Sequence, residues 1–118
     1  MTTPFSATTH PAGTGPVVTV LGEVDVATAP RLRAEIGALT LGPGQLLVID
    51  LAGVTFCDSS GISALIAARN LAEEAGAGVA LAAVPARLSR TFALIGLGDF
   101  FPAYASAEEA IASHPAVS

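Results

Sequence analysis

The sequence predicts an α/β fold: a single domain with a four- to five-stranded mixed, mainly parallel sheet and about four helices. Apolar, β-branched runs typical of buried strands alternate with segments whose apolar residues recur at helical spacing. Glycine and proline clusters separate these segments and mark their ends. The length of 118 residues fits one domain. Because strands that alternate with helices favour right-handed parallel crossovers, most strand pairs should be parallel.

The N-terminal part of the chain divides into a leader and a first strand. Residues 1–16 are rich in Thr, Pro, Gly and Ala, which indicates a loose leader with room for one edge strand near Phe5 to Thr9. The domain itself is expected over 17–118. The β-branched run Val17–Leu21 predicts a strand that ends at Gly22.

A first helix is expected to follow this strand. Thr28 is a residue type preferred at helix N-caps. Three apolar residues then recur at i, i+4 and i+7 spacing, and these are Leu32, Ile36 and Leu39. The helix should end before Gly42, where glycine and proline follow each other.

The centre of the chain predicts a buried strand and a second helix. Leu46–Ile49 is a continuous apolar run, as expected for a central strand covered on both faces. Asp50–Cys57 is a short connection that can continue in extended form. The next helix is expected to have Ser59 at its N-cap and to end at Gly76. Its apolar face consists of Ile62, Leu65 and Ile66.

The C-terminal part predicts one buried strand, one edge strand and two helices. Val79–Val84 is the buried strand, and Pro85 begins the helix after it. The apolar residues of that helix again recur at helical spacing, and they are Leu88, Phe92 and Ile95. Phe100–Ala105 is expected to form a short edge strand, because it contains a proline. Ser106 and Glu109 form a capping-box pattern that begins a short last helix.

The composition excludes several classes of partner. The net charge is −5, from 10 acidic residues and 5 arginines without any lysine. Nucleic acids and anionic membranes both require clustered basic residues, and these arginines form no cluster. No apolar run approaches the roughly 20 residues of a membrane-spanning helix. The single cysteine, Cys57, excludes an internal disulfide, so we expect a soluble protein of the reducing cytoplasm.

The sequence contains no residue pattern of an enzyme active site. His10 and His114 lie in the terminal segments, where neither is placed to act as a general base. Ser59 and Ser60 lack the G-x-S-x-G pattern of a hydrolase nucleophile. Cys57 has no cysteine or histidine neighbour for a metal site, and the five phenylalanines are expected in the core. The sequence therefore predicts no catalytic group, cofactor or metal.

One candidate site remains, the segment Asp58-Ser59-Ser60-Gly61 between a predicted strand and a helix. In a structural interpretation, Ser59 only caps the helix, and Asp58 adds favourable charge. In a functional interpretation, the Ser59 hydroxyl is exposed and accepts a phosphoryl group that faces amides at the helix N-terminus. That group would add a charge of about −1.5 to −2. The local pattern allows both interpretations.

Three ordered motifs indicate a family. They are Gly22–Asp25, Leu47–Leu51 and Val54–Gly61, and the segments Val79–Val84 and Thr91–Leu97 follow at the expected places. With these motifs, the chain beyond the leader resembles the STAS domain of bacterial anti-sigma factor antagonists. In that family, an unphosphorylated antagonist binds an anti-sigma factor that is also a serine kinase, and the sigma factor is released. The kinase then phosphorylates the antagonist with ATP, the complex dissociates, and a phosphatase resets the switch.

The resemblance assigns functions to particular residues. Ser59, the first serine of the D-S-S-G motif, would be the phosphoacceptor. The partner-binding residues would be Glu23, Asp25, Asp58, Ser60, Gly61 and Ile62. Because the carboxyl ends of parallel strands meet at one edge of a sheet, we expect the docking surface where the loop 22–28 meets the helix that begins at Ser59. Asp25, in an exposed loop, should have few native contacts.

Two other functions are considered. A STAS module that scaffolds a signalling complex, or senses a ligand, would never be phosphorylated and would not need an acceptor at Ser59. A small hydrolase that uses Ser59 would need a base within hydrogen-bond reach, and no histidine or lysine is placed to provide one. The sequence therefore favours a non-enzymatic regulator of transcription that does not itself contact DNA.

Overall fold

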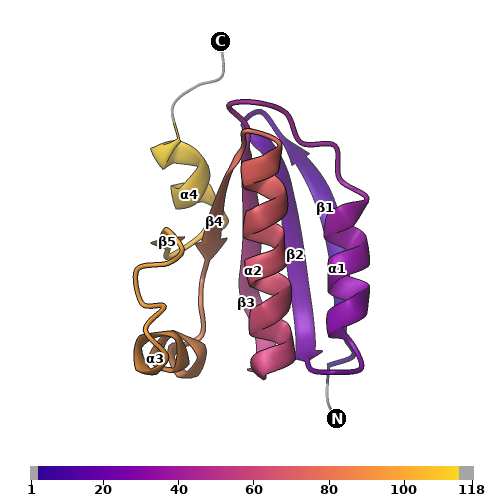
Figure 1. The fold of residues 1–118 in the computed structure, drawn as a ribbon, viewed down its shortest axis with the longest axis vertical. Helices are drawn as coiled ribbons and strands as arrows, with labels where there is room; N and C mark the ends of the chain where they lie inside the picture. Colours follow the sequence, from indigo (N-terminus) through magenta and orange to yellow (C-terminus); the bar gives the residue numbers. More distant parts are fainter. Residues whose placement is uncertain (1–2, 115–118) are drawn as a thin grey trace.

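The structure, a computed structural model, describes residues 3–114 as a five-stranded sheet with helices on both faces (Figure 1). The strand order is β1-β2-β3-β4-β5, in which β1 is antiparallel to β2 and every other pair is parallel. The strands are β1 Ser6–Ala12, β2 Gly15–Val24, β3 Leu46–Cys57, β4 Gly78–Ala82 and β5 Ala103–Tyr104. The helices are α1 Ala29–Gly37, α2 Ser59–Glu74, α3 Ala86–Leu94 and α4 Ala107–Ser113. The predicted mixed sheet and the four helices are confirmed.

The segment expected as a loose leader is largely part of the sheet. β1 pairs with β2 along its whole length, from Ser6 opposite Leu21 to Ala12 opposite Gly15. Pro11 is tolerated because β1 is an edge strand. Gly15, which follows the turn, lies close to β3, since a Cβ there would collide with the carbonyl oxygen of Leu46. The expected edge strand thus exists and runs further than Thr9.

Gly22 does not end β2, in contrast to the prediction. The strand continues to Val24, and its pairing with β3 shifts by one residue between Gly22 and Glu23. Gly22 has a φ of +86°, and a Cβ there would lie 2.8–2.9 Å from backbone atoms of residues 3–5. Glycine is therefore required for an irregular strand beneath a closely packed N-terminal segment.

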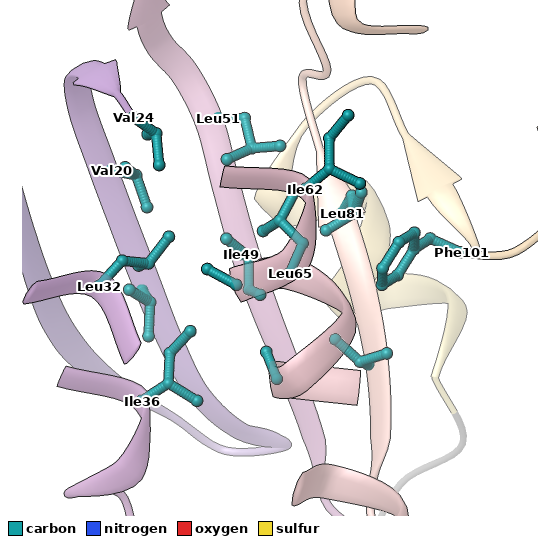
Figure 2. Close-up of a cluster of buried hydrophobic side chains, with 14 of the residues drawn as sticks. Val20, Val24, Leu32, Ile36, Ile49, Leu51, Ile62, Leu65, Leu81 and Phe101 are labelled. Carbon is teal, nitrogen blue, oxygen red and sulfur yellow. The ribbon is translucent and has the colours of Figure 1, made fainter. Parts of the chain in front are cut away.

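The main core lies between the sheet and the layer formed by α1 and α2. Alternate residues of β2 and β3 point toward this layer, and apolar side chains of α1 and α2 meet them (Figure 2). The side chains that meet in this way include Val20, Val24, Leu32, Ile36, Ile49, Leu51, Ile62 and Leu65. On the opposite face, α4 covers β3 and β4 through Leu46, Val48, Ala80, Ala82 and Ala110. β3 is therefore buried on both faces, as its apolar run predicts.

Helix α3 ends one residue earlier than the spacing of its apolar residues predicts. Leu88 and Phe92 are buried, but Ile95 is 53% exposed at the C-cap. The amide of Leu97 donates to the Phe92 carbonyl (2.7 Å), and that of Gly96, with a φ of +81°, donates to the Ala93 carbonyl (3.3 Å). These bonds form a Schellman motif, which returns Leu97 to the core in place of Ile95.

The last two strands are shorter than predicted. β4 ends at Ala82, because Ala83 adopts a φ of +53° and leaves the extended conformation. The amide of Ala83 donates to the Tyr104 carbonyl (2.8 Å). β5 is reduced to Ala103–Tyr104 at the sheet edge, within the predicted segment Phe100–Ala105.

Replacing Leu65 with alanine should destabilise the domain by about 2–5 kcal/mol, because the side chain is 1% exposed and its loss leaves a cavity between α2 and the sheet. Urea unfolding followed by circular dichroism measures this change. The control Ser63→Ala, at an exposed position of the same helix, should change the free energy of unfolding by less than about 0.5 kcal/mol. Equal unfolding midpoints for both variants would show that this helix face is not part of the core.

Candidate functional site at the carboxyl edge of the sheet

The carboxyl ends of β2 and β3 lie side by side, at the end of the molecule where α2 begins (Figure 1). Val24 and Cys57 form the last pair of the parallel register, and the Asp58 amide donates to the Val24 carbonyl (3.1 Å). We call the surface formed here by residues 23–28 and 56–60 the carboxyl edge. The structure thus brings together the two motifs that the parallel sheet predicts to be neighbours.

Asp58, and not Ser59, is the N-cap of α2. Asp58 has an extended backbone, and its Oδ1 accepts hydrogen bonds from the amides of Ser60 (2.8 Å) and Gly61 (3.2 Å). The carboxylate also lies at the positive end of the helix dipole, where negative charge is favourable. Ser59 is therefore the first residue of the helix, and the two amides that were expected to face an anion are already occupied.

The Ser59 side chain is exposed and takes no part in the local hydrogen bonding. Within residues 3–114 its hydroxyl makes no hydrogen bond, in contrast to the Asp58 carboxylate beside it. Ser60 is half-buried. A reagent can therefore reach the Ser59 hydroxyl without local unfolding of α2.

Gly61 and Ile62 are buried beneath the carboxyl edge. A Cβ at Gly61 would lie 2.5 Å from the Cys57 Sγ and 2.9 Å from the Val24 Cγ1, so α2 packs directly on the ends of β2 and β3. Ile62 is 7% exposed and points into the core (Figure 2). Both residues shape the surface from below, whereas Glu23 and Ser59 are exposed on it.

Asp25 has more native contacts than its loop position suggests. Its Oδ1 accepts hydrogen bonds from the amides of Ala27 (3.0 Å) and Thr28 (3.1 Å). The Thr28 hydroxyl accepts from the Asp25 amide (2.9 Å) and donates to the Glu23 carbonyl (2.8 Å). Thr28 precedes α1, but its hydroxyl does not cap that helix. These bonds hold the loop between β2 and α1 in one shape.

Two exposed apolar side chains at the carboxyl edge do not stand out in the sequence. Val26 is 76% exposed and Phe56 is 45% exposed. The phenylalanines are expected in the core, where large apolar residues usually lie. Phe56 is exposed because β3 continues past Val54, the last residue of the strand that is fully in the core. No signal in the sequence distinguishes it from a core residue.

Cys57 carries a neutral thiol at ordinary pH. Burial, together with a smaller effect from the negative charge of Asp58, raises the pKa of this thiol to about 11. The Sγ lies 3.7 Å from the Asp58 carbonyl oxygen, in position to donate to it. Within residues 3–114, no group of three or more His, Cys, Asp or Glu side chains is arranged to hold a metal ion.

The two histidines are remote from this surface. His10 pairs with Val17 in the β1–β2 hairpin, at the other end of β2 from Val24. His114 Nε2 lies 2.8 Å from the carbonyl oxygen of Gly44.

In the described part of the chain, no helix has the length and apolar character needed to cross a membrane.

Known proteins are similar to this chain in sequence and in fold. The family model described as Mlab, STAS domain, matches residues 8–102. The anti-sigma-B factor antagonist of Bacillus subtilis (strain 168) is 32% identical over 91 residues, which are 77% of this chain and 83% of that protein. An anti-sigma factor antagonist from Mycobacterium paratuberculosis has a solved structure with a TM-score of 0.76 and 33% identity, covering 97% of this chain and 98% of that one. The structure of the Bacillus cell fate determinant SpoIIAA in the phosphorylated form has a TM-score of 0.64 and 26% identity, covering 92% of this chain and 97% of that one.

Replacing Asp25 with alanine should lower the free energy of unfolding by about 0.5–2 kcal/mol, because the amides of Ala27 and Thr28 lose their acceptor. Asp25→Asn, which keeps an acceptor oxygen, should lose less. Glu23→Ala is the matched control, since the Glu23 side chain is exposed. Urea unfolding checks all three variants. An unchanged midpoint for Asp25→Ala would contradict the structural importance of this loop.

The reaction of Cys57 with iodoacetamide should be slow in the folded protein near pH 8 and should accelerate with pH up to about 11, because only the thiolate reacts. In urea the same thiol should titrate near its ordinary pKa of about 8.5. Mass spectrometry of quenched samples gives both rate profiles. A rate that levels off near pH 9 in the folded protein would disagree with the raised pKa.

Proposed function

The chain belongs to the STAS domain family of anti-sigma factor antagonists, and on this premise we propose that it is a partner-switching regulator of transcription without enzymatic activity. In the cytoplasm, its unphosphorylated form binds an anti-sigma factor that has serine kinase activity, and a sigma factor is released. Phosphorylation of Ser59 ends that binding, and a phosphatase restores it. Neither nucleic acid nor a membrane surface is a direct partner, as the net charge of −5 suggests.

The observation that carries this proposal is the exposed Ser59 hydroxyl in the first turn of α2. It is accessible and makes no hydrogen bond within residues 3–114, so a kinase can reach it without unfolding the helix. It also lies at the edge where the loop after β2 meets the start of α2. A group added at this hydroxyl therefore changes the docking surface itself.

The local charge explains why a phosphoryl group would end binding. Phosphorylation adds a charge of about −1.5 to −2. Because the Asp58 carboxylate already accepts from the Ser60 and Gly61 amides, the phosphate would lie beside a like charge and would not find these amides free. The phosphate would either displace the carboxylate or project from the surface. In both cases a partner that fits the unphosphorylated edge meets uncompensated negative charge.

The expected partner-binding residues then contribute in two ways. Glu23 and Ser60 supply polar groups at the surface, together with Asp58. Asp25 fixes the shape of the loop after β2 through its hydrogen bonds. Gly61 and Ile62 lie beneath this surface and hold the first turn of α2 in place.

Three serine variants test the proposal with ATP and one purified anti-sigma kinase from the same organism. Ser59→Ala should fold with a stability within about 0.5 kcal/mol of wild type, since Ser59 is exposed and makes no hydrogen bond in the described residues. It should bind the kinase and stay bound with ATP present. Ser59→Asp should bind more weakly, with a partial defect because it adds about one negative charge where phosphate adds about two. Ser60→Ala should behave like wild type.

Binding by calorimetry and phosphate incorporation by mass spectrometry are measured on the same samples. Incorporation that persists in Ser59→Ala and disappears in Ser60→Ala would move the acceptor by one residue. Phosphate incorporation in both Ser59→Ala and Ser60→Ala would show that neither serine is the acceptor. Wild-type protein that is phosphorylated by no kinase of its own cells would favour the alternative of a STAS scaffold or ligand-sensing module.

A further inference from the structure

A groove of about 190 Å³ adjoins the carboxyl edge on the side away from the β2–α1 loop. It lies between the end of β3 and α3, and its walls include Val54, Phe56, Cys57, Arg87, Leu88 and Thr91. Figure 1 shows α3 and the β2–α1 connection at the same end of the molecule, on either side of the start of α2. Asp58, the N-cap of α2, also lines the groove. The groove is therefore continuous with the surface around Ser59.

The volume of the groove indicates what kind of group can occupy it. Sites for small molecules have volumes of about 300–1,000 Å³. This groove is smaller and is lined largely by apolar side chains such as Val54 and Leu88. A single large apolar side chain from another protein fits it better than a whole small molecule does.

The exposed face of α3 extends the groove. Arg87, Thr91 and Leu94 are spaced i, i+4 and i+7, so they lie along one face of the helix, and the first two line the groove. Leu94 is 87% exposed, and the adjacent Ile95 is 53% exposed. Adjacent exposed aliphatic side chains next to an apolar groove are typical of a contact surface. The Schellman motif that ends α3 keeps Ile95 out of the core.

The charges on α3 indicate the chemistry of the partner. Arg87 and Arg90 are the ionisable residues of this helix, and within residues 3–114 neither makes an ion pair. They form a positive patch on a chain with a net charge of −5. The Asp58 carboxylate, on the other wall of the groove, is held by two amides of α2. An acidic side chain is therefore favoured near Arg87 and disfavoured near Asp58.

We propose that this groove and the exposed face of α3 form a second contact area for the anti-sigma partner. The partner inserts one large apolar side chain between Phe56 and Leu88, covers Leu94, and places a carboxylate against Arg87. This inference rests on the proposed function and extends it, because the partner then contacts the molecule on both sides of Ser59. The contact on α3 supplies affinity and selects an acidic partner segment, while Ser59 controls release.

The test uses Leu94→Ser and Arg87→Glu, two changes at exposed positions that leave the core intact. Each should weaken the Kd for the purified anti-sigma kinase by about tenfold or more, with an unchanged thermal midpoint. Arg87→Glu should also reduce the salt dependence of the association rate, because it removes an attractive charge. Calorimetry and stopped-flow fluorescence measure these effects.

Two matched controls lie away from the groove. Leu21→Ser changes an exposed leucine that alternates with the buried Val20 and therefore lies on the opposite face of the sheet from α1 and α2. Arg33→Glu changes an exposed arginine of α1. Both controls should bind the kinase within about twofold of wild type.

The possible outcomes separate this inference from the proposed function. If Leu94→Ser and Arg87→Glu bind like wild type while Ser59→Asp binds weakly, the second contact area is wrong and the proposed function stands. If wild type does not bind the kinase at all, both fail. If light scattering finds that wild type is a dimer and Leu94→Ser a monomer, a second copy of the chain fills the groove, and the inference is overturned.

Discussion

The carboxyl edge depends on one close contact, in which the first turn of α2 packs against the ends of β2 and β3. Gly61 leaves no space for a Cβ between itself and the side chains of Cys57 and Val24, and the Asp58 amide is bonded to the Val24 carbonyl. This contact joins two parallel strands and a helix at a single point. It fixes where α2 lies on the sheet, so that Ile62 enters the core while Ser59 remains exposed at the helix end.

The structure separates the residues that stabilise the site from the residue that is open to chemistry. Asp25 holds the loop after β2, Asp58 holds the start of α2, and Gly61 provides the close packing. Ser59 does none of these tasks in the described residues. A change at its hydroxyl can therefore alter the surface while the cap, the loop and the core keep their contacts. Such a separation suits a site that must change state repeatedly without unfolding.

Most of the fold follows from local sequence, whereas the errors come from contacts between distant segments. The alternation of apolar runs and helical spacing predicts the sheet and the helices, and the parallel sheet predicts that the segments around Asp25 and Ser59 are neighbours. The sequence analysis places Ser59 at the N-cap of α2, whereas β3 continues through Cys57 and Asp58 takes that position. A glycine looks the same in sequence whether it ends a strand or allows a close approach, so the packing of residues 3–5 on Gly22 could not be foreseen. The exposure of Phe56 likewise depends on how far β3 continues past Val54.

The burial of Cys57 has a consequence for oxidative conditions in the cell. Peroxides attack the thiolate of cysteine, and this thiol, with a pKa of about 11, remains protonated at neutral pH. Cys57 lies two residues before Ser59 and beneath the same helix turn. A cysteine with an ordinary pKa at this place would allow oxidation to disturb the packing of Gly61 and thereby the position of the serine. Because the thiol is neutral and partly covered, the packing of α2 on the strand ends beneath Ser59 is protected from oxidation.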